Sequence, residues 1–250
     1  MKQFLKAAAF ASATLVAGVS SASAVTLSYT GQTTGNSYYT SKITRSPVNV
    51  AGSSGSSTKV IAGGLNMTSS SSLGNFVAWC LDLEHFLKPV SNYVVTTNPF
   101  SNTGTIGAAG IARIQSVFDA NFASVNAADL KQSAAFQLAL WEALYDGNSF
   151  SLTSGLFKAR GYFGGSFTST ATQISSLAAG YLSNAQGYLG AKVWDLTFLE
   201  STASGRHQSQ ALVTVTMAPP PVPEVPLPAG GVLLVTALGG IAAVRRRRKG

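Results

Sequence analysis

The strongest pattern of apolar positions in the chain predicts an α-helix over residues 134–146. Its apolar stripe is formed by residues three and four positions apart, namely Ala134, Leu138, Trp141, Leu144 and Tyr145. Gln137 lies on the same stripe, so the face that packs into the core carries a primary amide. A buried amide without partners costs about 1–3 kcal/mol. We therefore expect the fold to supply hydrogen-bond partners, or a chemical use, for Gln137.

Short β-prone segments on both sides of this helix predict strands. They span residues 25–30, 37–44, 58–62, 76–83, 93–97, 193–199 and 211–216. Residues 76–83 are apolar on both faces, which is typical of a central strand, and Cys80 lies near the end of this segment.

Two more helical patterns, at residues 111–122 and 172–184, fall in the same stretch between the strands. Asn126, followed by Asp129 three residues later, is typical of an N-cap ahead of residues 134–146. Because the helices are inserted among strands, the expected fold class is α+β. We expect mainly an antiparallel β-sandwich or barrel with an inserted helical subdomain, plus a C-terminal transmembrane helix.

Residues 1–24 have the pattern of a secretory signal peptide. Lys2 and Lys6 precede an apolar run over residues 7–19, and residues 22–24 form an Ala-x-Ala cleavage site. We therefore expect export by the general secretory route and an extracellular domain over residues 25–217. Export places Cys80, the only cysteine, where disulfides form, although no second cysteine exists in the chain. Cys80 is then expected to be buried, paired with another chain or chemically protected.

The formal net charge of +8 is concentrated at the two ends of the chain. Lys2, Lys6 and residues 245–249 hold seven of the 17 basic residues, which leaves ten basic against eight acidic residues between Val25 and Ala218. No basic stripe is present there to neutralise phosphates, so nucleic acid is not an expected partner.

The C-terminal residues predict a membrane anchor. Residues 218–226 form a proline-rich spacer, and residues 227–244 are almost purely apolar and long enough to span a bilayer. A stop signal of five basic residues follows, namely Arg245, Arg246, Arg247, Arg248 and Lys249. Such a cluster stays on the cytoplasmic side, so the membrane is an expected partner, at least transiently, with the domain outside.

Residues 225–250 also resemble a known sorting signal. The motif consists of Val225, Pro226, Leu227, Pro228 and Ala229, directly before the apolar helix and the arginines. It is similar to the VPLPA variant of the PEP-type C-terminal signals (PEP-CTERM) of Gram-negative bacteria. In that family an exosortase, an integral-membrane enzyme, recognises the motif and processes the protein. The resemblance implies an exosortase-type partner and a final location at the cell surface or in the extracellular matrix.

Cys80 and Gln137 together have the chemistry of an internal thioester. A cysteine sulfur attacks a glutamine carboxamide held against it, expels ammonia and leaves an acyl group primed for an amine or a hydroxyl. This reaction requires that the strand end carrying Cys80 packs against the helix face carrying Gln137.

The same residues resemble the bacterial surface thioester domains, which pair an aromatic-preceded cysteine with glutamine in a Gln-x-aliphatic-aliphatic-Trp helix. The matching segments are Trp79-Cys80-Leu81-Asp82 and Gln137-Leu138-Ala139-Leu140-Trp141. The resemblance implies a thioester between Cys80 and Gln137, supported by Trp79, Asp82 and Trp141. It also implies adhesion, with a surface or matrix polymer as the covalent ligand. The best-known members belong to Gram-positive walls, so the anchor of this chain departs from theirs.

Two alternatives to the thioester remain open. In the first, Cys80 is a small buried hydrophobe and Gln137 an amide satisfied by loop backbone, in a non-reactive structural component of an extracellular matrix. In the second, Cys80 is the nucleophile of a cysteine hydrolase with His85 as its base and Asp82 and Glu84 beside them. On a strand Cys80 and His85 point to opposite faces, which argues against the hydrolase.

The sequence offers little for other enzymatic chemistry. His85 and His207 are the only histidines and show no clustered ligand spacing, so no metal site is expected. Phosphate loops, nucleophile elbows and dinucleotide fingerprints are missing from the sequence. We therefore expect no catalytic residues, no cofactor and no enzymatic activity.

Overall fold

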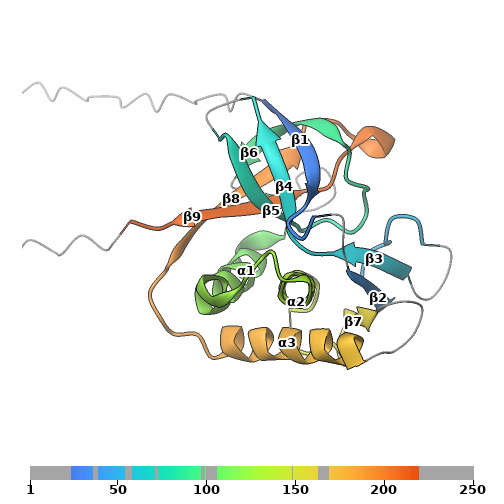
Figure 1. The fold of residues 1–250 in the computed structure, drawn as a ribbon, viewed down its shortest axis with the longest axis vertical. Coiled ribbons are helices and arrows are strands. Elements are labelled where there is room, and N and C mark those ends of the chain that lie inside the picture. The colour runs from blue at the N-terminus through green and yellow to red at the C-terminus, as the bar shows by residue number, and fades with distance from the viewer. Residues whose placement is uncertain are drawn as a thin grey trace, which may run out of the picture. The chain divides into compact units, whose positions relative to one another are not determined.

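Six antiparallel strands close into a barrel in the order β1-β4-β5-β9-β8-β6 (Figure 1). They are β1 (Val25–Gln32), β4 (Leu65–Ser69), β5 (Asn75–Cys80), β9 (Leu212–Met217), β8 (Trp194–Ser201) and β6 (Val90–Thr96). The computed structural model of the chain describes residues 24–35, 39–53, 58–70, 73–96, 99, 106–147, 149–162 and 169–219. The predicted α+β class, with mainly antiparallel β structure, is confirmed in its barrel form.

Strand β5 lies inside the barrel wall, between β4 and β9, as its two apolar faces predict. Ala78 pairs with Leu65 of β4, and Cys80 pairs with Leu212 of β9. The strand ends at Cys80 and not at residue 83, because the next two backbone N–H groups both turn toward the carbonyl of Ala211, at 2.9 and 3.4 Å. Cys80 is therefore the last residue of a central strand.

A second sheet of three antiparallel strands lies beside the barrel in the order β3-β2-β7. It consists of β3 (Thr58–Ala62), β2 (Tyr39–Arg45) and β7 (Lys158–Tyr162). Sequence patterning missed β7, because its five residues include two basic residues and a glycine. It also missed β4, a short Leu-Asn-Met-Thr-Ser run directly after two glycines. Both strands are too short and too weakly patterned to be recognised without their pairing partners.

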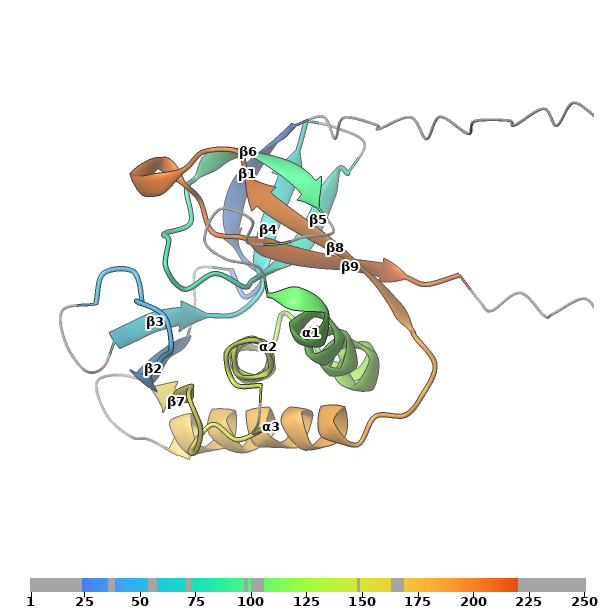
Figure 2. The ribbon, with the colours of Figure 1, turned by 180° about the vertical axis from the view of Figure 1, so that it is seen from behind.

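The three α-helices found among the described residues lie between β6 and β8 in the sequence, as predicted for an inserted helical subdomain. They are α1 (Gly107–Asn121), α2 (Leu130–Tyr145) and α3 (Ser169–Gln186), and two 3₁₀ turns occur at η1 (Phe122–Ser124) and η2 (Gly205–His207). Figures 1 and 2 both place α2 between the barrel and α3. Every residue from Ser133 to Leu144 is buried. Helix α2 is thus the centre of the domain, and its polar side chains must find partners inside the core.

The N-cap of α2 is Asp129 and not Asn126, which corrects the predicted start of this helix. The Asp129 carboxylate accepts hydrogen bonds from the backbone N–H groups of Lys131 and Gln132, at 3.0 and 2.9 Å. Asn126 instead accepts from the N–H of Ala128 within the preceding turn, at 3.0 Å. The helix begins at residue 130, one turn earlier than its apolar stripe indicates, because the cap and not the stripe sets its first turn.

An aromatic cluster joins β5 to the helices. Trp79 of β5 packs edge-on against Phe136 of α2 with ring centroids 4.8 Å apart, and Phe136 contacts Phe118 of α1 at 5.2 Å. All three side chains are fully buried. Such pairs contribute about 0.5–1.5 kcal/mol beyond the area that they bury. This cluster fixes the distance and the angle between the end of β5 and the N-terminal half of α2.

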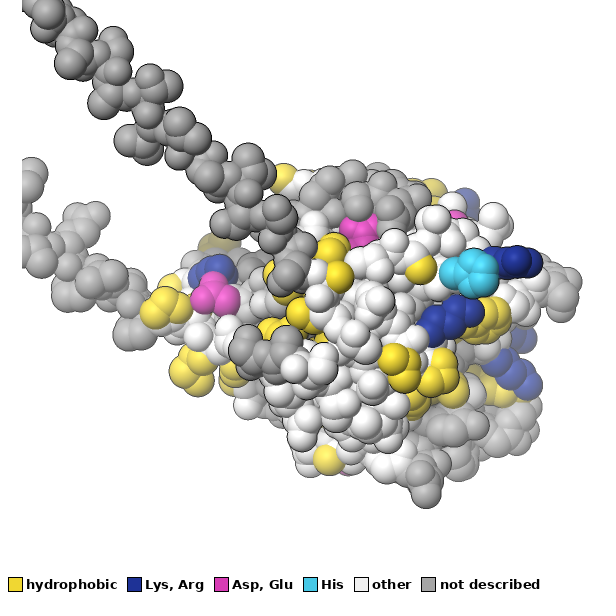
Figure 3. Space-filling model, turned by 90° about the horizontal axis from the view of Figure 1, so that it is seen from above, with side chains coloured by type: hydrophobic (Ala, Val, Ile, Leu, Met, Phe, Trp, Pro, Cys, Tyr) yellow, Lys and Arg dark blue, Asp and Glu magenta, His cyan; other side chains and the backbone are white. Residues whose placement is uncertain are grey.

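The chain's low content of charged residues, 10%, is visible on its surface. Figure 3 shows one face on which uncharged polar side chains and backbone cover most of the area, with hydrophobic and charged side chains in small groups. Surface ion pairs contribute little to stability in general. Burial of the apolar side chains of α2 contributes to the stability of this domain.

Several predicted segments lie outside the described residues. These are residues 1–23 of the signal peptide, most of the proline-rich spacer, the sorting motif Val225 to Ala229, the apolar run at residues 227–244 and the stop signal Arg245 to Lys249. In the described part of the chain, no helix has the length and apolarity needed to cross a membrane.

Candidate functional site

Cys80 is held at the end of β5 with its side chain turned inward. The residue is buried, and no second cysteine exists in the chain. Its Sγ donates a hydrogen bond to the backbone carbonyl of Asp82, at 3.0 Å. The same carbonyl accepts from Nε2 of Gln210, at 3.2 Å. These contacts fix the orientation of the thiol relative to the tight turn that follows the strand.

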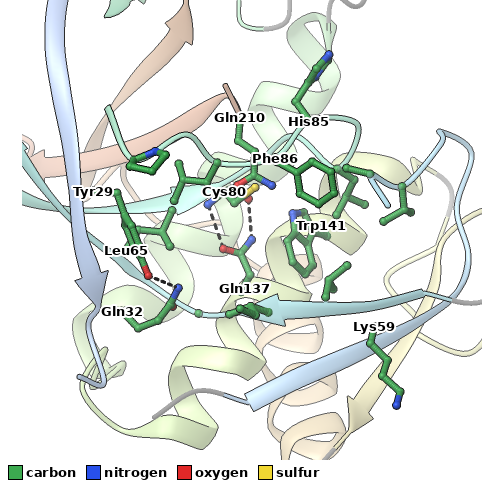
Figure 4. Close-up of a pocket in the computed structure, with 18 residues that line it drawn as sticks. Tyr29, Gln32, Lys59, Leu65, Cys80, His85, Phe86, Gln137, Trp141 and Gln210 are labelled. Carbon is green, nitrogen blue, oxygen red and sulfur yellow. Dashed lines mark hydrogen bonds between the residues drawn. The ribbon is translucent and has the colours of Figure 1, made fainter. Parts of the chain in front are cut away.

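Gln137 of α2 bonds to the backbone of Cys80 at both ends of its carboxamide (Figure 4). Its Oε1 accepts from the Cys80 N–H at 3.0 Å, and its Nε2 donates to the Cys80 carbonyl at 2.7 Å. The side chain is fully buried, so these two bonds remove most of the cost of desolvating the amide. The two residues that the sequence singled out, 57 positions apart, therefore lie side by side.

Tyr145 holds the same turn from a second point on α2. Its hydroxyl donates to the carbonyl of Leu81 at 3.0 Å and accepts from the N–H of Leu83 at 3.1 Å. Burial is the main reason that the pKa of the Tyr145 hydroxyl lies well above its ordinary value, so the group stays a neutral donor. Gln137 and Tyr145 thus clamp the segment from Cys80 to Leu83 onto the helix. The sequence did not predict this role of Tyr145. Tyr145 lies on the predicted apolar stripe, which indicates only that it faces the core.

The thiol of Cys80 is neutral at physiological pH. Burial raises its pKa well above the ordinary value of 9.0, and the nearby Asp82 carboxylate raises it further. The hydrogen bond to the Asp82 carbonyl and the indole N–H of Trp141 act in the opposite direction. The site therefore holds a protonated sulfur beside a neutral amide.

The indole N–H of Trp141 is a buried donor that faces this pair. In Figure 4 the indole nitrogen of Trp141 is turned toward the Cys80 sulfur and the Gln137 amide. Its Nε1 makes no hydrogen bond of ordinary geometry within the described residues, and the side chain is almost completely buried. Trp79 also has a buried Nε1 without a partner among these residues, but its ring packs on Phe136. Of the two tryptophans that the resemblance marks as supporting residues, only Trp141 lines the pocket described below.

Asp82 and His85 form a separate pair at the turn. Nδ1 of His85 lies 2.6 Å from Oδ2 of Asp82, and the other carboxylate oxygen accepts from the backbone N–H of Glu84, also at 2.6 Å. Figure 4 shows the imidazole of His85 pointing away from the Cys80 sulfur. The hydrogen bond of the thiol goes to a backbone carbonyl and not to this imidazole. The structure thus brings Asp82 and His85 together but does not orient His85 as a base for Cys80.

A pocket of about 490 Å³ opens directly beside Cys80 and Gln137. Its walls come from the barrel, from β3 and from the loops at residues 50–51 and 83–89, and they include Tyr29, Gln32, Phe86, Trp141 and Gln210. Sequence reasoning missed this pocket because its walls come from segments far apart in the chain. Across the described residues, no cluster of three or more His, Cys, Asp or Glu side chains is arranged to hold a metal ion.

Comparisons with known proteins give only a weak structural similarity. No protein-family model and no curated protein matches the chain. Among solved structures, the chain is similar to the N-terminal domain of the pilus tip adhesin Cpa of Streptococcus pyogenes. That similarity has a TM-score of 0.39 and a sequence identity of 12%, and covers 76% of this chain and 98% of that domain.

Proposed function

We propose that this chain is an exported surface protein whose domain forms an internal thioester between Cys80 and Gln137. The acyl group then attaches the protein covalently to a surface or matrix polymer. One observation carries the proposal, the two-point hydrogen bond between the Gln137 amide and the backbone of Cys80. These bonds hold the Gln137 carboxamide against the backbone of Cys80 in the core. Prior positioning of two residues that react lowers the entropic part of the reaction barrier.

Thioester formation joins the Cys80 sulfur to the side-chain carbonyl carbon of Gln137. The sulfur attacks that carbon, the C–N bond of the amide breaks, and ammonia leaves with the proton of the thiol. Negative charge develops on Oε1 as the sulfur adds. The N–H of Cys80, 3.0 Å from Oε1, donates to that oxygen and acts as an oxyanion donor.

The neutral state of the thiol is the main obstacle to this reaction, and Trp141 opposes it in part. Burial disfavours the thiolate, which is the more reactive form of cysteine. Charge also appears on the sulfur when a later nucleophile expels it from the thioester. The indole N–H of Trp141, which has no hydrogen bond of ordinary geometry among the described residues and acts to lower the pKa of the thiol, is available to stabilise that charge in both steps. A hydrogen bond to a charged group contributes about 1.5–3 kcal/mol.

The pocket provides the route for the attachment step. A nucleophile that enters the pocket lies beside Gln137, Cys80 and Trp141, which all line it. The carbon–sulfur bond breaks, the nucleophile's proton passes to the sulfur, and Cys80 is again a thiol. The product is an amide or an ester at residue 137.

A non-reactive matrix component is the second candidate, and two observations favour it. The Gln137 amide already has good hydrogen bonds at both ends, and the Cys80 thiol is neutral. In that case the two residues act only to join β5 to α2. The chemistry separates the candidates, because only the thioester reacts with amines.

Methylamine labelling of the full-length protein tests the proposal. Methylamine should add at Gln137 and release a thiol at Cys80 that reacts with a maleimide. Cys80→Ala and Gln137→Glu should each prevent incorporation, whereas Gln173→Ala, which alters an exposed glutamine of α3 outside the pocket, should keep it. No incorporation into the folded parent would favour the non-reactive component.

The sorting part of the proposal rests on the resemblance of residues 225–250 to PEP-type signals. Replacing Pro226 and Pro228 by Ala keeps the apolar run and the basic residues, so a plain membrane anchor would behave as before. We expect the double variant to lose processing while it still inserts in the membrane, as followed by the mass of the surface-exposed protein. Normal processing of the variant would exclude recognition of this motif by an exosortase.

A further inference from the structure

We infer that the acceptor of the Gln137 acyl group is a hydroxyl of a neutral carbohydrate chain bound in the pocket beside Cys80. This inference rests on the proposed thioester and specifies its ligand. It is carried by the charge and the chemistry of the pocket walls.

The pocket lacks a counter-charge for an ammonium group. Its walls include no Asp or Glu among the described residues. The one lysine in its lining, Lys59, places Nζ over the ring of Tyr162, 4.6 Å from the centroid, and Figure 4 shows this ammonium pointing away from Gln137. His85 is paired with the buried Asp82 carboxylate. A lysine or polyamine ligand would have to lose its hydration without gaining a partner, which is unfavourable.

Neutral hydrogen-bonding groups line the same pocket. Nε2 of Gln32 donates to the hydroxyl of Tyr29 at 3.1 Å, and Nε2 of Gln210 donates to the Asp82 carbonyl at 3.2 Å. Carboxamide and phenol groups both donate and accept hydrogen bonds, as sugar hydroxyls do. These groups therefore suit a polyhydroxylated ligand better than a charged one.

Apolar and aromatic side chains supply the complementary surface for a sugar ring. Trp141 forms part of the pocket wall, and Phe86 and Ile61 lie in its lining with 61% and 48% of their surface exposed. A pyranose presents C–H groups on its faces and hydroxyls on its edge, so an aromatic and amide lining matches both. The volume of about 490 Å³ lies within the roughly 300–1,000 Å³ that is usual for small-molecule sites.

Transfer of the Gln137 acyl group from the Cys80 sulfur to a sugar hydroxyl needs no additional reactant. The hydroxyl oxygen attacks the side-chain carbonyl carbon of residue 137, the bond from that carbon to the Cys80 sulfur breaks, and the hydroxyl proton passes to the sulfur. The products are an ester and a free thiol. A hydroxyl is a weaker nucleophile than an amine, but binding in the pocket raises its effective concentration at the carbon.

The experiment follows thioester loss in the full-length protein by intact mass against ligand concentration. The probes are cellotetraose and the N-acetylglucosamine tetramer, with Nα-acetyl-lysine amide as the cationic comparison. We expect at least one oligosaccharide to give saturable kinetics and an ester adduct that hydroxylamine cleaves. Phe86→Ala should raise the half-saturation concentration severalfold, and Leu189→Ala, at a fully exposed position outside the pocket, should not. Saturable amide formation with the lysine, or no ester from either oligosaccharide, would overturn the inference.

Binding to Cys80→Ala separates this inference from the thioester itself. The variant cannot form the bond, so weak binding of the oligosaccharides, measured by NMR shifts, reports the pocket alone. Binding that Phe86→Ala weakens supports a carbohydrate site even if the parent never loses ammonia. If the lysine probe binds and the oligosaccharides do not, the carbohydrate inference is overturned even if the thioester forms.

Discussion

The carboxamide of Gln137 is joined to Cys80 at both ends, through the backbone N–H and the backbone carbonyl of the same residue. A side chain on the buried face of α2 thus completes the hydrogen bonding of the last residue of β5. This contact joins helix and strand at one point, and it places the Gln137 amide against the backbone of Cys80. If the proposed thioester forms, the same contact both joins α2 to β5 and brings together the two residues that react.

Trp141→Phe tests the role of the indole N–H that faces Cys80. The substitution keeps most of the ring and removes the donor that faces Cys80. We expect methylamine to open the thioester roughly 10- to 100-fold more slowly, which corresponds to the loss of a hydrogen bond to a developing charge. The measurement is the time course of intact mass.

Trp79→Phe is the matched control for this change. Trp79 also has a buried Nε1 without a described partner, but it packs on Phe136 and does not line the pocket. Its substitution should lower stability and leave the opening rate close to that of the parent. Equal slowing in both variants would show that packing, and not the Trp141 donor, controls the rate.

Glu142 predicts a pH dependence of stability. Burial, together with the nearby Asp146 carboxylate, raises its pKa from 4.5 to about 8, and its Oε1 accepts from the N–H of Ser151 at 2.9 Å. Between pH 4.5 and about 8, Glu142 therefore keeps its proton in the folded state and loses it in the unfolded state. The stability gained from this proton is fully present below pH 4.5 and is lost as the pH rises through about 8.

Glu142→Gln should remove this contribution. The free energy of unfolding of the parent, relative to the variant, should fall by about 1.4 kcal/mol for each pH unit within that window. Urea unfolding at several pH values measures the difference. Parallel curves for parent and variant would show that Glu142 is already ionised in the folded protein.

Asp129→Ala tests which residue caps α2. Loss of the two hydrogen bonds from the N–H groups of Lys131 and Gln132 should lower the free energy of unfolding by about 1 kcal/mol. Asn126→Ala removes only a bond within the preceding turn and should cost less. Thermal unfolding distinguishes them, and a larger loss at position 126 would restore the N-cap that the sequence indicated.

His85→Ala addresses the cysteine hydrolase. If His85 were the base for Cys80, its removal would abolish labelling of the native protein by an electrophilic probe. We expect a different pattern, in which the native parent and His85→Ala are both silent toward thiol reagents until methylamine is added. Strong labelling of the native parent that disappears in His85→Ala would support the hydrolase instead.

The sequence predicted most at residues 134–146, where an apolar helical stripe includes one polar residue, Gln137. The apolar stripe at residues 134–146 predicted the buried helix, and Gln137 on that stripe predicted the need for a partner. Strands β4 and β7 were missed because pairing, and not composition, makes them strands. The pocket could not be predicted, because it forms only when the barrel, β3 and two loops come together. Tyr145 was visible on the stripe, but its two bonds depend on the turn after β5, which periodicity does not describe.

The intact mass of the purified protein reports directly whether Cys80 and Gln137 form a thioester. Thioester formation expels ammonia, so the folded parent should be lighter by the mass of one ammonia than the mass calculated for the same chain, with any removed signal segments left out of the calculation. Cys80→Ala and Gln137→Glu should have the masses of their sequences, because neither partner forms the bond without the other. A parent whose mass equals that of its sequence, with Cys80 reactive toward maleimide once the protein is unfolded, would contradict the thioester.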